Sequence, residues 1–454
     1  MSRFYQPFIK ARRAIVQVFQ DRNIGHGGET ARLVASGAAE MVVDSLPSVA
    51  PPRSAAHHWR LIVCILLPFA AGFYLSYLLR TINALISTQL TSDLGLSPGA
   101  LGLVTSVYFL TMAVLQVPVG VGLDRYGPRR VQSAFMLVAA AGAALFAVAD
   151  GLLTLVAARL LIGIGFAPAL MAGLKAIVSW FPKERIALAN GCMVMLGTLG
   201  ALTATAPAEL LLQWTGWRGM FELLAAATAA CAALTYFIVP ERRMTAPAQG
   251  SASVNLRSIF LDPRFWRLAP LCATCIGTAW ALQGLWAAQW LTDVERLDRA
   301  GVIWHLFVMT VALSAGALLL GMTADRLRRH GVRPQTILAV VAALFITAQL
   351  ALILRLPLPS YLPWSMVAAV GGANVLGYAI LAEYFPKEAI GRANGALNVF
   401  QLSGAFALQY APGLVIGHWT SETGHYPAVA YQTAFGLGVA LQIAALAWFV
   451  QSRA

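Results

Sequence analysis

The sequence predicts an all-α membrane protein with twelve transmembrane helices in two six-helix halves and with both termini in the cytoplasm. Three observations carry this prediction: a mean hydropathy of +0.70 with 59% apolar and 11% charged residues, basic residues concentrated in alternate loops, and an internal repeat. Ordinary soluble domains contain about 25% charged residues, so the composition excludes a soluble enzyme. A lipid-spanning helix needs roughly 20 apolar residues, and the chain after His58 is long enough for twelve helices with their loops.

Apolar runs bounded by Gly, Pro and charged residues locate the individual helices. The expected spans are residues 61–90, 98–122, 131–149, 152–181, 187–212, 220–239, 266–291, 301–322, 334–355, 359–384, 391–414 and 429–450. They divide the chain into an N-terminal half, 58–239, and a C-terminal half, 266–454, joined by the polar cytoplasmic linker 240–265.

The first 57 residues form a cytoplasmic extension that we expect to be flexible. Within it, residues 4–22 mix aromatic and basic side chains, a pattern that predicts either a helix on the inner leaflet or an unstructured tail. Met41 is an alternative start of translation. The extension therefore remains separate from the membrane part of the prediction.

The basic residues fix the orientation of the helices. With a cytoplasmic N-terminus, 25 of the 32 Lys and Arg residues fall in cytoplasmic segments, and the outer loops hold Arg218, Arg296, Arg299 and Arg355. Because cytoplasmic loops of membrane proteins are enriched in Lys and Arg, this bias explains the net charge of +13 without nucleic acid.

Two segments of the chain return about two hundred residues later. FPKERIALANG at 181–191 matches FPKEAIGRANG at 385–395 at eight of eleven positions, and GVGLDRYGPRRV at 120–131 is echoed by GMTADRLRRHGV at 321–332. Both pairs fall in cytoplasmic loops at equivalent places, as parallel repeats about an axis along the membrane normal require.

From about residue 60 to its end the chain resembles the major facilitator superfamily of secondary transporters. The loop at 120–131 is similar to the family's motif between helices two and three, RLLIGIGFAP at 159–168 to its fourth-helix Arg and Gly motif, and WTGWRGMF at 214–221 to its usual turn between helices five and six. GTLGALTATAPAEL at 197–210 lacks the Gly-Pro dipeptide of drug antiporters, which favours the anion-handling branches. The resemblance implies alternating access by two rocking halves.

The loop motif predicts a charge cluster that changes with conformation. Asp124 closes its helix where a carboxylate opposes the helix dipole, so we expect it to pair with Arg125, Arg129 or the N-terminus of another helix, which the resemblance implies is helix eleven. This cluster is either a latch for the outward-facing state or a static loop that sets orientation. The full set of conformational residues is Gly120, Asp124, Arg125, Arg129, Arg130, Arg159, Asp325, Arg326 and Arg329.

Arg80 is the main candidate for binding a substrate. It lies deep in the first span, where an Arg costs roughly 2.5–3.5 kcal/mol, and it shares a helical stripe with Tyr77 and Asn83. A cavity-facing Arg there resembles the anion-handling branches, in which the guanidinium binds a carboxylate or phosphate. The alternative is an internal partner such as Glu209.

Two other intramembrane charges lie on the fourth helix. The resemblance implies that Arg159 organises the contact between helices one and four. Lys175 lies close to the inner end of the same helix, where we expect it to reach toward the interface, and Pro168 between the two offers a bend.

Polar and aromatic side chains from the second half complete the predicted substrate site. They are Trp280 and Gln283 in helix seven, Asn374 and Tyr378 in helix ten, and Asn398 and Gln401 in helix eleven. Trp286 and Trp290 instead fit the outer aromatic belt. Glu209 is a possible proton-coupling carboxylate, although most such groups are interfacial or ion-paired.

These observations predict an inner-membrane, multi-pass transporter that takes up a small organic anion with protons and acts as a monomer. Export of lipophilic drugs or metabolites is the alternative within this class, and a membrane sensor that signals through the extension is the alternative outside it. We expect no enzymatic activity and no cofactor, because the sequence contains no HExxH or nucleotide-binding loop. We also expect no metal site, because Cys272–Cys275 has no His or acidic residue nearby.

Overall fold

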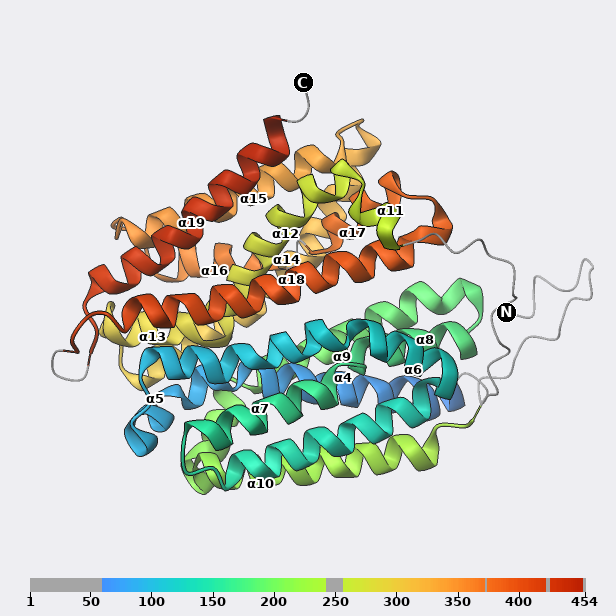
Figure 1. The fold of residues 1–454 in the computed structure, drawn as a ribbon, viewed down its shortest axis with the longest axis horizontal. Coiled ribbons are helices and arrows are strands. Elements are labelled where there is room, and N and C mark those ends of the chain that lie inside the picture. The colour runs from blue at the N-terminus through green and yellow to red at the C-terminus, as the bar shows by residue number, and fades with distance from the viewer. Residues whose placement is uncertain (1–58, 242–255, 372–373, 422–424, 452–454) are drawn as a thin grey trace, which may run out of the picture. The chain divides into compact units, whose positions relative to one another are not determined.

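A computed structural model describes residues 59–241, 256–371, 374–421 and 425–451. The predicted extension, 1–57, and most of the predicted linker lie outside these residues. The chain from Trp59 onward forms one compact unit, and Figure 1 shows its helices arranged as two bundles. We call residues 59–241 the first bundle and residues 256–451 the second bundle.

The first bundle contains long helices with two short π or 3-10 turns. Its elements are η1 (Ile62–Leu66), α4 (Leu67–Thr81), α5 (Asn83–Leu94), α6 (Pro98–Ala147), α7 (Leu152–Phe166), α8 (Ala169–Trp180), η2 (Lys183–Arg185), α9 (Ile186–Thr203) and α10 (Ala206–Ile238).

The second bundle is also built from helices, with one short π turn. Its elements are α11 (Leu256–Phe260), α12 (Pro263–Ala281), η3 (Leu282–Trp286), α13 (Ala287–Asp293), α14 (Arg299–Arg329), α15 (Pro334–Ile353), α16 (Tyr361–Val370), α17 (Asn374–Tyr384), α18 (Lys387–Ile416) and α19 (Ala428–Gln451).

Among the described residues, nine helices are long and apolar enough to span a membrane. Two of them, α6 and α10, each contain two crossings joined at a glycine, since Gly127 (φ +80°) and Gly216 (φ +64°) leave the helical conformation. The fifth crossing runs through α9 into the start of α10, and the tenth joins α16 to α17. The twelve predicted crossings are therefore all present.

Prolines account for the breaks inside two crossings. α7 ends at Phe166 and α8 begins after Pro168, so the bend expected at this proline is confirmed. The predicted single span 187–212 is divided at Thr205, whose backbone is not helical, and Pro207 follows in the first turn of α10. A proline lacks the N–H that a continuous helix needs, and it is tolerated in a first turn.

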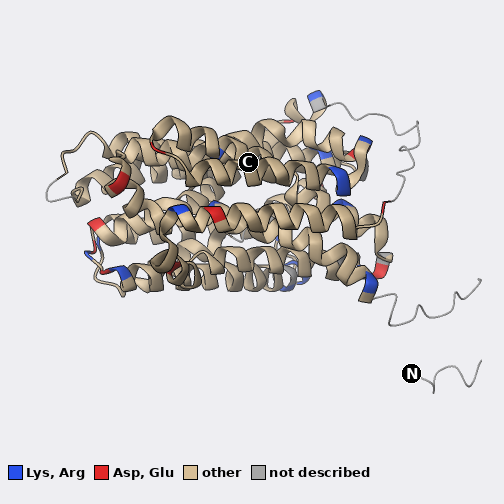
Figure 2. Ribbon diagram, turned by 90° about the horizontal axis from the view of Figure 1, so that it is seen from below, with Lys and Arg blue, Asp and Glu red and all other residues tan. Residues whose placement is uncertain are grey.

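The two ends of the helices differ in charge. We call the end that carries the turns at Gly127 and Gly331 the basic end, because Lys and Arg positions gather there, on the right in Figure 2. The other end, which carries the turn at Gly216 and the start of α14, is called the opposite end. Both names describe the molecule without assigning a side of the membrane.

The bundles approach each other most closely where α18 lies beside α6 (Figure 1). A Cβ atom on Gly413 would come within 2.4 Å of the Pro98 carbonyl oxygen, and one on Gly102 within 3.1 Å of the Gln409 carbonyl oxygen. Small residues permit this approach between membrane helices. The contact lies at the opposite end, where α6 begins and α18 finishes.

Candidate anion site between the bundles

Arg80 lies on α4 at the interface between the two bundles. Its guanidinium carbon is 4.1 Å from the ring centre of Tyr77 on the same helix and 5.2 Å from that of Trp280 on α12. Phe109 of α6 stacks on Trp280 at 5.8 Å with an interplanar angle of 10°. The cation is therefore held against aromatic faces that come from both bundles, an arrangement that attracts a guanidinium electrostatically.

The Arg80 side chain is half-buried at this interface. Within the described part of the chain, no acidic side chain lies within 4.0 Å of its nitrogens. Glu209, which we considered as its internal partner, binds Arg299 instead. A charged group in a membrane span without an internal counter-ion is expected to serve a function.

Asn83 lies behind Arg80. Only 2% of the residue is exposed, its side-chain amide donates to the Arg80 carbonyl oxygen at 3.2 Å, and its Oδ1 accepts from Arg159. Its hydrogen bonds are thus made within the protein. The stripe of Tyr77, Arg80 and Asn83 is present, but the structure brings only the first two to the interface between the bundles.

Arg159 joins α7 to α4, the contact between the fourth and first crossings that the family resemblance implied. Its guanidinium is fully buried, donates to the Leu79 carbonyl oxygen at 2.8 Å, and lies over the rings of Phe146 and Phe221 at 4.6 and 5.5 Å. Arg159 and Arg80 therefore act on the two sides of the same helix turn.

The second bundle contributes part of the predicted polar set. Gln283 in η3 is buried, and its amide nitrogen has no hydrogen-bond partner among the described residues. Tyr378 on α17 donates to Gln401 on α18 at 3.3 Å. Asn398 is half-buried on α18, and the side chain of Asn374 lies outside what the structure describes.

Trp286 and Trp290 do not form an aromatic belt, so that prediction is wrong. They are only 1% and 2% exposed. Both indole N–H groups donate hydrogen bonds to acceptors within the protein. Trp286 donates to the Gln409 carbonyl oxygen at 2.9 Å and Trp290 to Glu295 at 3.0 Å. A buried indole normally finds such a partner.

An ion pair between Arg299 and Glu209, which we did not predict, joins the bundles at the opposite end. Arg299 at the start of α14 donates to both Glu209 oxygens, at 3.1 and 2.5 Å, and to the Leu85 carbonyl oxygen of α5 at 2.9 Å. It also reaches Thr88 at 3.4 Å. One guanidinium of the second bundle thus binds two elements of the first.

At the basic end, the loop motif makes a different set of pairs from the expected one. Among the described side chains Asp124 pairs with Lys175 of α8, and not with Arg125 or Arg129. The side chains of residues 387 and 388, at the start of helix eleven, lie outside what the structure describes. The expected partner was wrong because Lys175 extends toward the basic end and brings its ammonium group to the end of the neighbouring crossing.

The remaining residues of the motif are divided between the bundles. Arg129 and Arg130 both pair with Glu241, which follows the last crossing of the first bundle. Arg125 lies over the Tyr126 ring at 5.2 Å, and a Cβ atom on Gly120 would meet no other atom within 4 Å. Arg326 and Arg329 are exposed, and the Asp325 side chain lies outside what the structure describes.

The comparisons with known proteins agree with this architecture. Residues 68–408 match the Major Facilitator Superfamily. The chain is 27% identical over 307 residues to a probable L-galactonate transporter of Escherichia coli K12, covering 64% of this chain and 67% of that protein. It is 26% identical over 390 residues to the nitrite extrusion protein of Bacillus subtilis 168, covering 85% and 91%.

Solved structures share the fold at low sequence identity. A bacterial homologue of the human lysosomal transporter Spinster, in an inward-facing and unoccupied conformation, has a TM-score of 0.71 and 18% identity and covers 88% of this chain and 98% of that one. A D-xylose–proton symporter has a TM-score of 0.64 and 15% identity, covering 86% and 97%. The chain belongs to the major facilitator superfamily and is a multi-pass membrane transporter.

Proposed function

We propose that this protein takes up a small organic anion across the bacterial inner membrane by alternating access, with protons as the coupling ion, and that it acts as a monomer. The observation that carries the proposal is the Arg80 guanidinium, which lies between the bundles with no acidic side chain within 4.0 Å in the described residues. The relatives named for L-galactonate and nitrite transport support an anionic substrate.

In this proposal Arg80 binds the substrate's negative charge. Its planar fork of N–H groups suits a carboxylate in two parallel hydrogen bonds, while Tyr77 and Trp280 hold the guanidinium from either side. Because Trp280 belongs to the second bundle, an anion bound at Arg80 contacts both bundles. Gln283, with its free amide N–H groups, and the Tyr378–Gln401 pair then serve the substrate's polar remainder.

Glu209 is the residue through which proton binding is coupled to the conformational change. Its negative charge holds Arg299 and thereby closes the opposite end. A proton on Glu209 removes that charge, so protonation and opening of this end are coupled through one carboxylate. In this proposal the basic end and both termini lie in the cytoplasm, so closure of the opposite end belongs to the inward-facing state.

The test is ligand-dependent thermal stability of the purified protein in detergent. L-galactonate, nitrite, a neutral sugar and a lipophilic cation are added separately to the wild type, to Arg80→Gln, and to Arg355→Gln, which removes an exposed charge elsewhere. A ligand at 100 times its dissociation constant adds about 2.7 kcal/mol of stability.

We expect an anion to stabilise the wild type and Arg355→Gln and to lose its effect in Arg80→Gln. Stabilisation by lipophilic cations that is indifferent to Arg80→Gln refutes the anion proposal and favours export of lipophilic compounds. Uptake in proteoliposomes with and without an imposed proton gradient then measures direction and coupling.

A further inference from the structure

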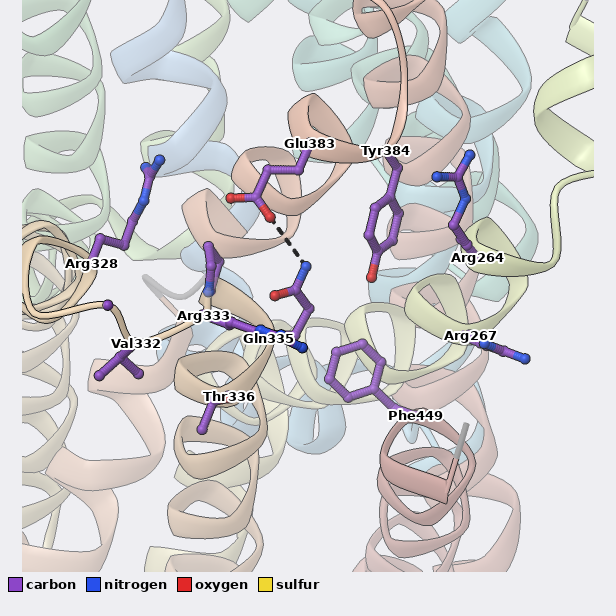
Figure 3. A pocket seen from close by; sticks show the side chains of 12 residues that line it. Arg264, Arg267, Arg328, Val332, Arg333, Gln335, Thr336, Glu383, Tyr384 and Phe449 are labelled. Carbon is purple, nitrogen blue, oxygen red and sulfur yellow. Dashed lines mark hydrogen bonds between the residues drawn. The ribbon is translucent and has the colours of Figure 1, made fainter. Parts of the chain in front are cut away.

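A cavity of about 650 Å³ lies at the basic end of the second bundle (Figure 3). It is formed where α12 begins, where the turn between α14 and α15 crosses, and where α17 and α19 end. The side chains that matter for its chemistry are Arg264, Arg267, Arg328, Arg333, Gln335 and Glu383. The cavity is remote from Arg80 and takes no part in the proposed transport site.

The first bundle has a cavity at the equivalent place. Its volume is about 440 Å³, and it is lined by residues 125–130, 179–180 and 239–241. Gly127 in this cavity and Gly331 in the other both have a positive φ, of +80° and +81°. Each follows one copy of the repeated Asp-Arg pair, at 124–125 and at 325–326. The two cavities are therefore related by the internal repeat.

The equivalent cavities differ in how their arginines are neutralised. In the first bundle Glu241, two residues after Val239, pairs with Arg129 and Arg130. In the second bundle α19 contributes Phe449 to the cavity wall, and none of the residues of this helix is acidic.

The acidic groups near the second cavity do not replace Glu241. Asp262 pairs with Arg264 at 2.8 Å, and Glu383 accepts from the Gln335 amide at 3.2 Å. Arg328 and Arg333 have no acidic side chain within 4.0 Å in the described residues. Two arginines of the second cavity are thus without an acidic partner among the described residues.

We propose that the cavity of the second bundle binds a phosphate ester, which gives Arg328 and Arg333 an anionic partner as Glu241 does for the arginines of the first bundle. Arginine forks bind phosphate oxygens in pairs, and the N-terminus of α15 (Pro334–Ile353) adds the positive end of a helix dipole. The cavity lies at the ends of the spanning helices, the level of phospholipid head groups, and basic pockets there bind anionic lipids.

Gln335 indicates a second chemical group on the ligand. Its Oε1 is buried and has no hydrogen-bond partner among the described residues, while its amide nitrogen is bound to Glu383. A free acceptor beside unneutralised arginines suits a hydroxyl group next to a phosphate. A phospholipid with a glycerol head group presents both, and inorganic phosphate presents the anion alone.

The experiment measures thermal unfolding of the full chain in detergent during titration with short-chain phosphatidylglycerol, short-chain phosphatidylcholine, and inorganic phosphate. The variants are Arg328→Gln/Arg333→Gln and Gln451→Glu, which places an acidic residue at the end of α19. Arg355→Gln is the matched control, because it removes one exposed arginine at the opposite end.

We expect phosphatidylglycerol to raise the melting temperature saturably and phosphatidylcholine not to do so. The apparent affinity falls about fivefold for each arginine removed and also falls in Gln451→Glu, with Arg355→Gln unchanged. A matching shift with inorganic phosphate assigns the site to free phosphate rather than lipid. The proposal is overturned if the two lipids raise the melting temperature equally and inorganic phosphate has no effect. It is also overturned if Arg355→Gln and the double variant bind phosphatidylglycerol with equal affinity.

Discussion

Replacing Arg299 by glutamine should open the opposite end of the transporter. The change removes two charge-assisted hydrogen bonds to Glu209, at 3.1 and 2.5 Å, and one to the Leu85 carbonyl oxygen at 2.9 Å. Hydrogen bonds to charged groups contribute about 1.5–3 kcal/mol each. Because 38% of the Arg299 side chain is exposed, solvent screens much of this, and we expect about 1.5–2 kcal/mol in total. That corresponds to a shift of roughly 10- to 30-fold between closed and open populations.

The assay is the distance between spin labels placed on the two bundles at that end. Ser92 on α5 and Ala300 on α14 are both exposed and suit labelling through cysteine in a background without the native cysteines. Arg299→Gln should populate longer distances, and Arg296→Gln, which removes an exposed charge three residues earlier, should not. Glu209→Gln should lengthen the distance in the same way, because it removes the charge that holds Arg299. Identical distance distributions for Arg299→Gln and Arg296→Gln would refute the latch.

Three further substitutions test contacts within the first bundle by the melting temperature in detergent. Asn83→Ala deprives Arg159 of an acceptor in a buried site and should cost about 1.5–3 kcal/mol. Asp124→Asn breaks the pair with Lys175, but 71% of the Asp124 side chain is exposed, so the expected loss is below about 1 kcal/mol. Gly127→Ala forces a side chain into a left-handed backbone and should cost about 1–2 kcal/mol.

Each of these substitutions has its own control. Ser92→Ala on α5 should leave the melting temperature unchanged, and a similar fall there would remove the case for a specific Asn83 contact. Gly120→Ala has ordinary helical backbone and open space around its Cβ position, so it should be harmless where Gly127→Ala is not. The double variant Lys175→Met/Asp124→Asn should lose no more stability than either single variant. If the two losses of stability add in full, the pair has no coupling energy.

Hydropathy, together with the Gly, Pro and charged residues that bound the apolar runs, predicted the crossings well. A helix that spans a bilayer needs a certain length and an apolar composition, and both can be read directly from the sequence. The bend at Pro168 followed from local backbone chemistry in the same way. Hydropathy does not separate a lipid-facing from a protein-facing side chain, however, and this is why Trp286 and Trp290 were assigned to a belt. Their burial depends on partners far away in sequence, such as the Gln409 carbonyl oxygen.

Charge pairs were harder to predict than crossings. Arg299 was counted only as an outer-loop charge, although its partner Glu209 was already a candidate, because ninety residues and a bundle boundary separate the two. The partner of Asp124 was misassigned for a related reason: both residues were singled out, but the tilt of neighbouring helices decides which cation reaches the carboxylate. Arg80 was identified correctly as an unusual charge, while its aromatic contacts from Trp280 required the packing of both bundles.

The π turn η3 in the seventh crossing separates two stretches of helix that serve different neighbours. Before it, α12 packs against α18 and α19, and after it, α13 lies against α5 and α14. Such a turn holds one more residue than an α-helical turn, so converting it to regular helix would rotate everything beyond it by about 100°. Trp290 and Asp293 would lose their present orientation while Trp280 kept its own. The π turn therefore sets the rotation of the part that carries Trp290 relative to the part that carries Trp280, and a single-residue deletion within η3 should change that rotation.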